Sequence, residues 1–352
     1  MDSVGGSENG LHIAILVPNA HDLQTGGNVY NRRMTEALGP EGTPRVVSWE
    51  PKNDPLPDVA SSDEDGIVVD SLLARHPGAL RALREARPAA TIILLTHYLR
   101  CIDPATSDPE VAAAERGALD AVDGAVTTSR FTKQSLVEEG VPADRVKVAP
   151  PGLGKRYRGP RPSRLERAPP RMLTVANLLP EKGLQAFVEV LRDLRSVPWT
   201  WTLVGDASLD PDYAEEVIGR IREAGLSERV TYTGSVPPDV LRSWYDRADL
   251  FVLPSRFETR SLSTREAMAR GLPVVGYRVG GLVENFGMAS AGHLVPAGNR
   301  AAFRAALRSL LTDPMARVHK GRMAWRHSQT FPTWAEAAER FQFALNVLCS
   351  RG

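Results

Sequence analysis

The segment from Phe257 to Gly281 reads FETRSLSTREAMARGLPVVGYRVGG, and it decides the fold of the second half of the chain. It follows the apolar run Asp249 to Pro254 (DLFVLP), which predicts a buried strand with Glu258 on the turn after it. A helix carrying Glu266 and a second strand, Pro273 to Tyr277, come next. Ligands of open parallel sheets bind beyond the carboxyl ends of the strands, so both carboxylates are predicted to face a polar ligand. The alternative is a solvated helix face with a surface pair of glutamates.

Length, charge and cysteine content limit the class of protein. The 352 residues are enough for two domains of ordinary size. The net charge of +1 argues against nucleic acid as the main partner, and Cys101 and Cys349 are too far apart to indicate a disulfide framework. The chain has no apolar run of about 18 residues and no signal-peptide pattern at its start, so we expect a cytoplasmic protein without a transmembrane helix.

The first half of the chain alternates apolar runs with helical patterns, which predicts an α/β domain with a parallel sheet. The expected strands are His12 to Pro18, Arg45 to Trp49, Gly66 to Asp70, Thr91 to Thr96, Gly124 to Thr128 and one within Pro142 to Pro151. The expected helices are Asn28 to Leu38, Ser71 to Ala86, Pro109 to Ala121 and Arg130 to Glu139.

Two features at the ends of these strands are candidates for binding. Gly26 and Gly27 stand between the first strand and the first helix, where backbone N–H groups and the helix dipole favour an anion. The dinucleotide fingerprint G-x-G-x-x-G is absent there. His97 follows the apolar strand TIILLT directly. The alternatives are a simple tight turn at the glycine pair and a structural role for His97.

The second half repeats the same alternation after a basic connection. Residues 154–170 are rich in Arg and Pro, with six basic residues against Glu166, which is typical of a linker. Their charge could attract a phosphorylated acceptor or an anionic membrane surface, and the alternative is a solvated connection. The expected strands that follow are Met172 to Ala176, Trp199 to Val204 and Arg229 to Thr233, and the expected closing helices are Asn299 to Thr312, Pro314 to Arg326 and Thr333 to Leu348.

The chain resembles the GT-B retaining glycosyltransferases, specifically glycosyltransferase family 4. The resemblance is carried by Glu258, seven residues, then Glu266-Ala267-Met268-Ala269-Arg270-Gly271-Leu272-Pro273, and by Pro180-Glu181-Lys182-Gly183. It extends from His12 to the last helix. It implies two Rossmann-like domains with parallel sheets facing each other across a cleft: an acceptor domain at residues 11–153, a linker at 154–170, a donor domain at 171–330 and a closing helix at 331–350 that returns to the first domain.

The resemblance also implies roles for single residues. Glu266 is expected to hold the ribose hydroxyl groups, Glu258 to lie by the sugar, and Lys182 to bind the diphosphate. His97 is expected close to the donor sugar, and Gly26 and Gly27 near the diphosphate and the acceptor. The backbone at the strand ends near Gly205 and Val236 is expected to hold the base and ribose. No metal and no cofactor are expected beyond the nucleotide-diphosphate sugar, which is a co-substrate.

The sequence departs from the family pattern at two places. Asn177 stands where the family has an arginine, so one cation for the leaving diphosphate is missing there, and Arg260 is the candidate to replace it. The family's Gly-Phe-Gly-Leu is replaced by Thr259-Arg260-Ser261-Leu262. Losing both glycines is expected to restrict the backbone and to bring an arginine and a serine into the sugar site. Either the donor is unusual or its cleavage is impaired.

We therefore predict a retaining glycosyltransferase that moves a sugar from a nucleotide-sugar donor to a hydroxyl-bearing acceptor, either a small molecule, a glycan or a lipid. Three alternatives stay open at this point. A GT-B nucleotide-sugar epimerase would share the nucleotide site but need no acceptor. A nicotinamide-dependent dehydrogenase is disfavoured by the missing glycine fingerprint. A non-catalytic nucleotide-sugar binder would tolerate both departures.

Overall fold

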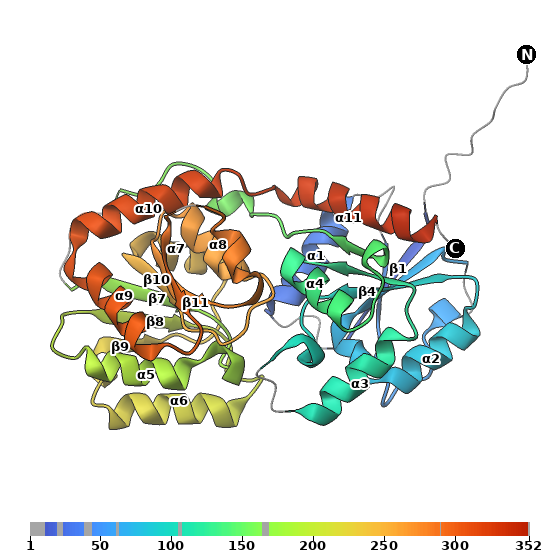
Figure 1. Cartoon of the computed structure of the whole chain (residues 1–352), viewed down its shortest axis with the longest axis horizontal. Coiled ribbons are helices and arrows are strands. Elements are labelled where there is room, and N and C mark those ends of the chain that lie inside the picture. Colours follow the sequence, from blue (N-terminus) through green and yellow to red (C-terminus); the bar gives the residue numbers. More distant parts are fainter. Residues whose placement is uncertain are drawn as a thin grey trace, which may run out of the picture. The chain divides into compact units, whose positions relative to one another are not determined.

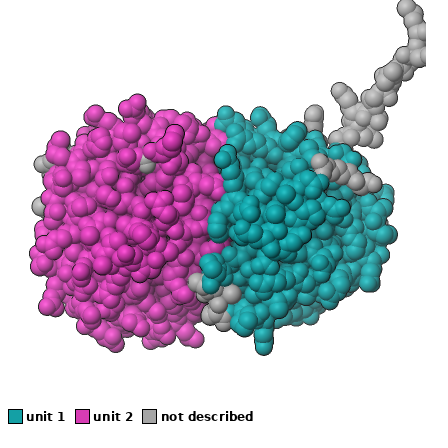
Figure 2. Space-filling model, in the orientation of Figure 1, with its two compact units in different colours: residues 1–151, 334–352 teal, residues 152–333 magenta. Residues whose placement is uncertain are grey.

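The computed structural model divides into two compact units (Figure 2). Unit 1 comprises Met1–Pro151 and Trp334–Gly352, and unit 2 comprises Gly152–Thr333. The structure describes residues 11–19, 24–38, 44–60, 63–104, 108–163, 169–288 and 290–350. The last helix is thus grouped with unit 1, although it follows unit 2 in the chain.

Unit 1 is built on a parallel sheet (Figure 1). The strand order in this sheet is β2-β1-β3-β4-β5-β6. Strands β3 and β4 are buried along their whole length because they are central in the sheet and consist largely of valine, isoleucine and leucine. The strands are β1 (Ile13–Val17), β2 (Arg45–Ser48), β3 (Gly66–Asp70), β4 (Thr91–Thr96), β5 (Gly124–Thr127) and β6 (Val146–Val148).

Five α-helices belong to unit 1, in the part of the chain that the structure describes. They are α1 (Gly26–Leu38), α2 (Pro77–Ala86), α3 (Pro109–Leu119), α4 (Arg130–Glu138) and α11 (Trp334–Cys349). Helix α11 packs beside α1 and buries Phe341 and Leu345 in the core of unit 1 (Figure 1). The helix predicted from Ser71 to Ala86 is in fact two pieces, a 3₁₀ turn at Ser71–Arg75 and then α2. Pro77 causes the break, since it has no N–H group and restricts the residue before it.

Unit 2 has a second parallel sheet, with the order β12-β11-β10-β7-β8-β9. Its strands are β7 (Arg171–Val175), β8 (Thr200–Val204), β9 (Val230–Tyr232), β10 (Leu250–Leu253), β11 (Val274–Arg278) and β12 (Gly292–Pro296). Its helices are α5 (Leu184–Asp193), α6 (Pro211–Glu223), α7 (Pro238–Arg247), α8 (Leu262–Ala269), α9 (Arg300–Thr312) and α10 (Pro314–Ser328). The sequence prediction did not include β12, α6 and α7.

Short 3₁₀ turns connect several of these elements: η1 (Asp58–Ala60), η2 (Ser71–Arg75), η3 (Arg100–Ile102), η4 (Ala143–Arg145), η5 (Lys155–Tyr157), η6 (Pro180–Lys182), η7 (Ser227–Arg229) and η8 (Gly280–Asn285). Turn η5 lies in the segment predicted as a separate linker. There Tyr157 is buried against Tyr245, with ring centroids 5.6 Å apart, and the Arg158 guanidinium donates to the Phe331 carbonyl oxygen at 2.7 Å. The described part of residues 154–170 is therefore packed into unit 2, and residues 164–168 lie outside the described residues.

Each sheet has a point at which the strand order reverses. In unit 1 the chain runs from β1 to the edge strand β2 and then returns to β3 on the other side of β1. In unit 2 it runs from β7 through β8 to β9 and then crosses to β10 on the other side of β7. Loops diverge at such switch points and leave a crevice beyond the carboxyl ends of the strands. These two crevices are therefore where a ligand site is expected in each unit.

Candidate functional site

An ion pair lies at the switch point of unit 2. Lys182, on turn η6 after β7, donates from Nζ to Glu258 Oε1 at 2.9 Å. Glu258 follows β10, and the same oxygen accepts from Ser255 Oγ at 2.7 Å. Glu258 is buried and the Lys182 side chain is 21% exposed, so the ammonium group is the accessible member of the pair. The structure thus brings together two residues that were predicted from separate motifs.

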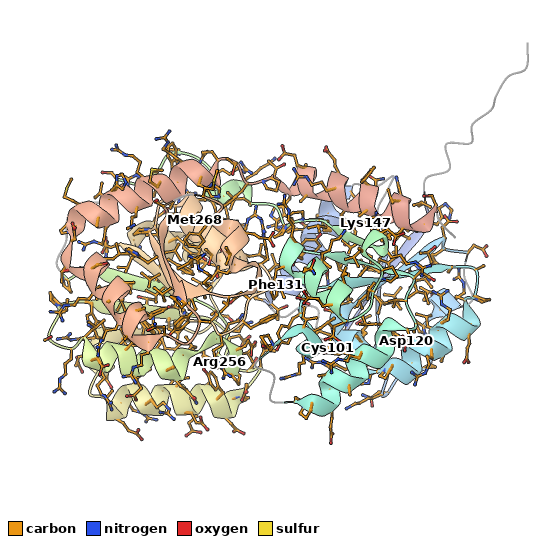
Figure 3. The ribbon with its side chains drawn as sticks, in the orientation of Figure 1. Cys101, Asp120, Phe131, Lys147, Arg256 and Met268 are labelled. Carbon is orange, nitrogen blue, oxygen red and sulfur yellow. The ribbon has the colours of Figure 1, made fainter. Side chains whose placement is uncertain are left out.

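The loops that carry this pair meet backbone to backbone. Gly183 has φ 65°, and a Cβ atom there would lie 2.3 Å from the Pro254 carbonyl oxygen. The backbone N–H group of Arg256, a residue labelled in Figure 3, donates to the Glu181 carbonyl oxygen at 2.7 Å. Only glycine allows both the positive φ and the close approach. Gly183 therefore fixes the separation of the lysine turn and the glutamate loop.

Asn177 and Gly205 join the ends of β7 and β8. Asn177 Oδ1 accepts from the Asp206 N–H group at 3.1 Å. A Cβ atom on Gly205 would lie only 1.9 Å from the Ala176 carbonyl oxygen. Val236 is half-buried and packs against the core of unit 2. The structure gives Asn177 a role in holding the neighbouring loop, and contact of these three positions with a substrate remains a prediction.

Arg260 was the candidate to replace the cation missing at Asn177. Its guanidinium pairs with Glu284 Oε2 at 2.8 Å, and its side chain is 12% exposed. The Asn285 side-chain amide donates to the carbonyl oxygens of Arg260 and Ser261 and anchors this loop. The charge of Arg260 is therefore balanced inside unit 2, which weakens its candidacy as the replacement cation.

Ser261 has φ 63°, the only positive φ of a non-glycine residue in the described part of the chain. Ser261 thus adopts a glycine-like conformation although it carries a Cβ atom. Such a conformation costs a residue with a Cβ atom about 1–3 kcal/mol and persists only when its surroundings impose it. Here the serine also caps α8, which begins at Leu262, since its Oγ accepts from the Thr264 N–H group at 3.4 Å.

Glu266 projects from α8, and its Oε2 accepts from the Tyr245 hydroxyl at 2.9 Å. Burial raises the pKa of Glu266 to about 7, while the hydrogen bonds from Tyr245 and Tyr157 and the charge of Arg156 oppose this shift. A carboxyl group in a crevice with a pKa raised towards neutral pH is a common feature of functional sites. Its other acceptor positions could take a diol, as predicted for ribose.

Replacing Glu266 by glutamine should make the protein more stable at alkaline pH. The folded-state pKa of Glu266 lies above the value of 4.5 for a free glutamate, so ionisation at this position destabilises the fold. That loss accumulates as pH rises from about 4.5 to about 7 and is absent from the glutamine variant. Between about pH 4.5 and about pH 7, the urea midpoint of the variant should rise relative to that of the unchanged protein. Above this range the difference between the two midpoints should stay constant. Midpoints that differ by the same amount at every pH would contradict the shifted pKa.

Unit 1 has its own cluster at its switch point. His97, directly after β4, contacts Asn31 of α1, with Nε2 and Oδ1 2.7 Å apart. Asn31 Nδ2 donates in turn to Asp70 Oδ2, at the end of β3, at 2.7 Å. The edge of the His97 ring lies against Tyr30, with centroids 5.2 Å apart. Helix α1 and the ends of the neighbouring strands β3 and β4 thus place polar side chains at one point.

The glycine pair lies inside the first turn of α1 and not in a loop before it. A Cβ atom on Gly27 would lie 2.9 Å from His97 Cδ2 and 3.0 Å from Cγ, whereas a Cβ on Gly26 would meet nothing within 4 Å. The structure therefore explains Gly27 by the close approach of the His97 ring. It gives no steric reason for Gly26.

Gly27→Ala should lower turnover roughly 10- to 100-fold, because it forces the His97 ring to shift by a substantial part of an ångström. Gly78→Ala, in the first turn of α2, is the matched control, because a Cβ atom there would also meet nothing within 4 Å, and it should leave turnover unchanged. Initial rates of both variants, with thermal midpoints measured alongside, test this. Full activity in Gly27→Ala would place His97 outside the reaction.

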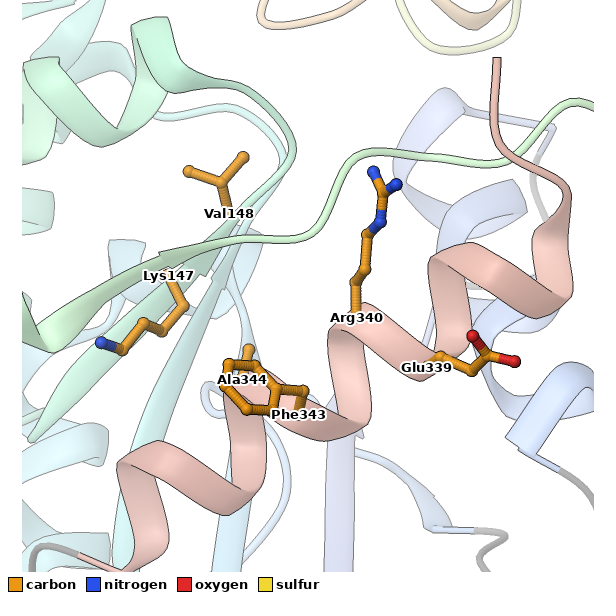
Figure 4. A pocket seen from close by; sticks show the side chains of 6 residues that line it. All are labelled: Lys147, Val148, Glu339, Arg340, Phe343 and Ala344. Atoms are coloured by element: carbon orange, nitrogen blue, oxygen red, sulfur yellow. The ribbon is translucent and has the colours of Figure 1, made fainter. Parts of the chain in front are cut away.

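A pocket of about 390 Å³ in unit 1 contains none of the predicted residues. It is lined by Lys147 and Val148 of β6 and by one face of α11 around the exposed Phe343 (Figure 4).

Among the described residues, no group of three or more His, Cys, Asp or Glu side chains is arranged to hold a metal ion. None of the described helices is both long enough and apolar enough to cross a bilayer.

Comparison with known families matches residues 169–313 to the family described as glycosyl transferases group 1. The matched residues make up less than half of the chain. Among similar proteins, a D-inositol 3-phosphate glycosyltransferase of Paenarthrobacter aurescens is 31% identical over 243 residues, which is 63% of this chain and 58% of the relative. A 2-deoxystreptamine glucosyltransferase of Streptomyces kanamyceticus is 30% identical over 230 residues, 61% of this chain and 58% of the relative. The matched region thus spans less than two thirds of the length of these relatives.

Solved structures show that the fold is GT-B. Sucrose-phosphate synthase from Thermosynechococcus elongatus superposes with a TM-score of 0.81 at 21% identity, covering 97% of this chain and all of that one. Alr3699/HepE from Anabaena, solved in complex with UDP and glucose, superposes with a TM-score of 0.77 at 18% identity, covering 96% and 99% of the two chains. The prediction of two Rossmann-like domains is confirmed.

Several residues of these clusters were not predicted from the sequence. They are Asn31, Asp70, Tyr245, Ser255 and Glu284. Asp70 is the last residue of the buried strand β3 and Ser255 comes two residues after β10, so their position could have marked them as His97 was marked. The others lie within helices or on turns and are polar residues without a distinctive spacing. Their partners are revealed only by the fold.

Proposed function

We propose that the protein is a retaining glycosyltransferase that moves a sugar from a nucleoside diphosphate sugar to a hydroxyl group of an acceptor. The observation that supports this best is the Lys182–Glu258 pair at the switch point of a group 1 glycosyl transferase domain. It places a cation beside a carboxylate, which suits a diphosphate next to a sugar. The names of the relatives and the UDP complex of a structural neighbour agree with this class of donor.

In this proposal unit 2 holds the donor. The Lys182 ammonium group moves from Glu258 Oε1 to the diphosphate when the donor binds. There it stabilises the negative charge that develops on the diphosphate as the sugar–phosphate bond breaks. Glu258, held by Ser255, then accepts from hydroxyl groups of the sugar. Glu266, oriented by Tyr245, accepts from the ribose diol. His97 of unit 1 contacts a substrate hydroxyl and assists the transfer.

The acceptor attacks from the face that the diphosphate leaves. A double displacement would need a carboxylate able to form a covalent sugar intermediate. Glu258 and Glu266 are both assigned to holding the donor, and the proposal has no further carboxylate for that role. The leaving phosphate therefore takes the proton of the acceptor hydroxyl, and the sugar passes through a cation-like state. The product keeps the anomeric configuration of the donor.

The deciding experiment incubates the full chain with a panel of nucleotide sugars and acceptors. The acceptors D-inositol 3-phosphate and 2-deoxystreptamine come first, since the relatives are named for them. Transfer appears as a glycosylated acceptor by mass spectrometry, and the anomeric proton coupling of fresh product should show retention. Inversion would refute the mechanism. A changed sugar that stays on the nucleotide without acceptor would instead indicate an epimerase, and binding without turnover a non-catalytic binder.

The proposal includes no metal and no resident cofactor. Lys182 and helix N-termini supply the charge that a divalent ion would otherwise provide. Turnover should therefore be unchanged by EDTA. A cytoplasmic location and a peripheral membrane contact through basic residues of 154–170 remain predictions, which fractionation and vesicle binding would test.

A further inference from the structure

We infer that Asp70 and Asn31 are positioning residues that hold His97 as the tautomer protonated at Nε2, so that Nδ1 accepts a hydrogen bond from a substrate hydroxyl group. This inference rests on the proposed function and specifies what His97 does in it. It follows from the order of donors and acceptors in the cluster at the switch point of unit 1. For each hydrogen bond in the cluster, only one assignment of donor and acceptor is possible.

Asp70 sets the orientation of Asn31. The Asp70 side chain is buried, and its Oδ1 accepts from the Leu72 N–H group at 2.9 Å. Its Oδ2 lies 2.7 Å from Asn31 Nδ2. A carboxylate only accepts hydrogen bonds, so the amide of Asn31 must turn its NH₂ group towards Asp70. A flipped amide would place two acceptor oxygens against each other.

Asn31 then sets the tautomer of His97. With the NH₂ group committed to Asp70, the amide presents Oδ1 to His97 Nε2 at 2.7 Å. A carbonyl oxygen cannot donate, so Nε2 must carry the hydrogen and donate it to Asn31. A neutral imidazole has one N–H group, which leaves Nδ1 with its lone pair. Asp70 itself lies 3.7 Å from Nε2, too far to replace this bond.

The surroundings keep the ring neutral and in place. Burial lowers the pKa of His97, against the opposing charge of Asp70. The titratable groups that face the ring are Asp70 from β3 and Tyr30 from α1, whose hydroxyl donates to the Ala149 carbonyl oxygen at 2.9 Å. The His97 N–H group of the backbone donates to Ser71 Oγ at 3.1 Å.

Nδ1 is the remaining position for a ligand. The His97 side chain is 10% exposed, and none of the described residues donates a hydrogen bond to Nδ1. A ring that is held at Nε2, at its backbone and against Gly27 cannot turn to offer a donor instead. The group it recognises must therefore be a hydrogen-bond donor, and a sugar or acceptor hydroxyl fits. A substrate carbonyl or phosphate oxygen does not fit.

The test is a long-range ¹H–¹⁵N spectrum of the full chain labelled at histidine, recorded without substrate at pH 7.5. The signals of His97 are assigned by their loss in His97→Gln. We expect a pyridine-type Nδ1 and a pyrrole-type Nε2 in the unchanged protein. In Asn31→Asp both nitrogens should become pyrrole-type, since the added carboxylate favours the imidazolium. Asn346→Asp, the same change on the exposed face of α11, should leave the spectrum unchanged.

A kinetic measurement tests whether Asn31 positions His97. Asn31→Leu should lower kcat roughly tenfold and leave the KM for the donor within a factor of two. The opposite tautomer in the unchanged protein would overturn the inference even if transfer is observed, and so would an unaltered kcat in Asn31→Leu. The spectrum needs no substrate, so it tests the tautomer independently of the transfer reaction. The expected tautomer without any turnover would mean that the proposed function fails while the assignment of the tautomer holds.

Discussion

Lys182→Met should lower kcat roughly 10²- to 10³-fold, a loss of about 3–4 kcal/mol of transition-state stabilisation. The ammonium group is the cation that the sequence and the structure both place at the switch point of unit 2, and Asn177 and Arg260 are occupied elsewhere. In the proposed mechanism the departing diphosphate would then be stabilised by helix N-termini without a side-chain cation. Initial rates at saturating donor and acceptor measure the effect. Lys147→Met, on β6 of unit 1, is the matched control and should keep full activity.

A second variant separates catalysis from stability. Methionine at 182 leaves the buried Glu258 carboxylate opposite an uncharged chain, and such an uncompensated charge destabilises a protein. In Lys182→Met combined with Glu258→Gln the carboxylate is gone, so the thermal midpoint should recover while turnover stays low. Recovery of turnover together with stability would mean that Lys182 acts only through the fold.

Gly205→Ala should strongly destabilise unit 2, by about 3 kcal/mol or more. The new Cβ would lie 1.9 Å from the Ala176 carbonyl oxygen and 3.0 Å from the Asn177 nitrogen. Both are backbone atoms at the end of β7, which cannot rotate away as a flexible side chain would. Relief would require separating β7 from β8 at the crevice. A lower urea midpoint, with loss of nucleotide binding, is the expected result.

Gly219→Ala is the matched control for that variant. Gly219 lies in the middle of α6, and a Cβ atom there would meet nothing within 4 Å. Alanine is favoured over glycine inside a helix by up to about 1 kcal/mol, so this variant should be slightly more stable. If Gly205→Ala were as stable as Gly219→Ala, the close approach of β7 and β8 would be refuted.

The segments that were predicted well have a strong local pattern. Strands β4 and β10 are short runs of apolar residues bounded by polar ones, and α8 lies between Ser261 and Gly271 as the spacing indicated. Strand β12 was missed because it is only half-buried and lacks a continuous apolar run. Helix α7 was missed because it exposes most of its length and buries only Tyr245 fully. Local periodicity is a weak guide where few side chains reach the core.

The sequence by itself determined the order of most strands and helices, the α/β class, the family resemblance of Glu258 to Gly281, and the candidates Lys182, Glu266 and His97. These depend on residues close together in the chain. Only the tertiary structure decided that Lys182 pairs with Glu258, 76 positions away, and that Asn31 joins Asp70 to His97 across 39 and 66 positions. It also decided that Arg260 is paired with Glu284 and that Asn177 holds Asp206. A polar side chain forms a hydrogen bond with a donor or acceptor that lies within about 3 Å of it. The connections between strands determine which groups come that close, and the spacing of residues along the chain does not predict them.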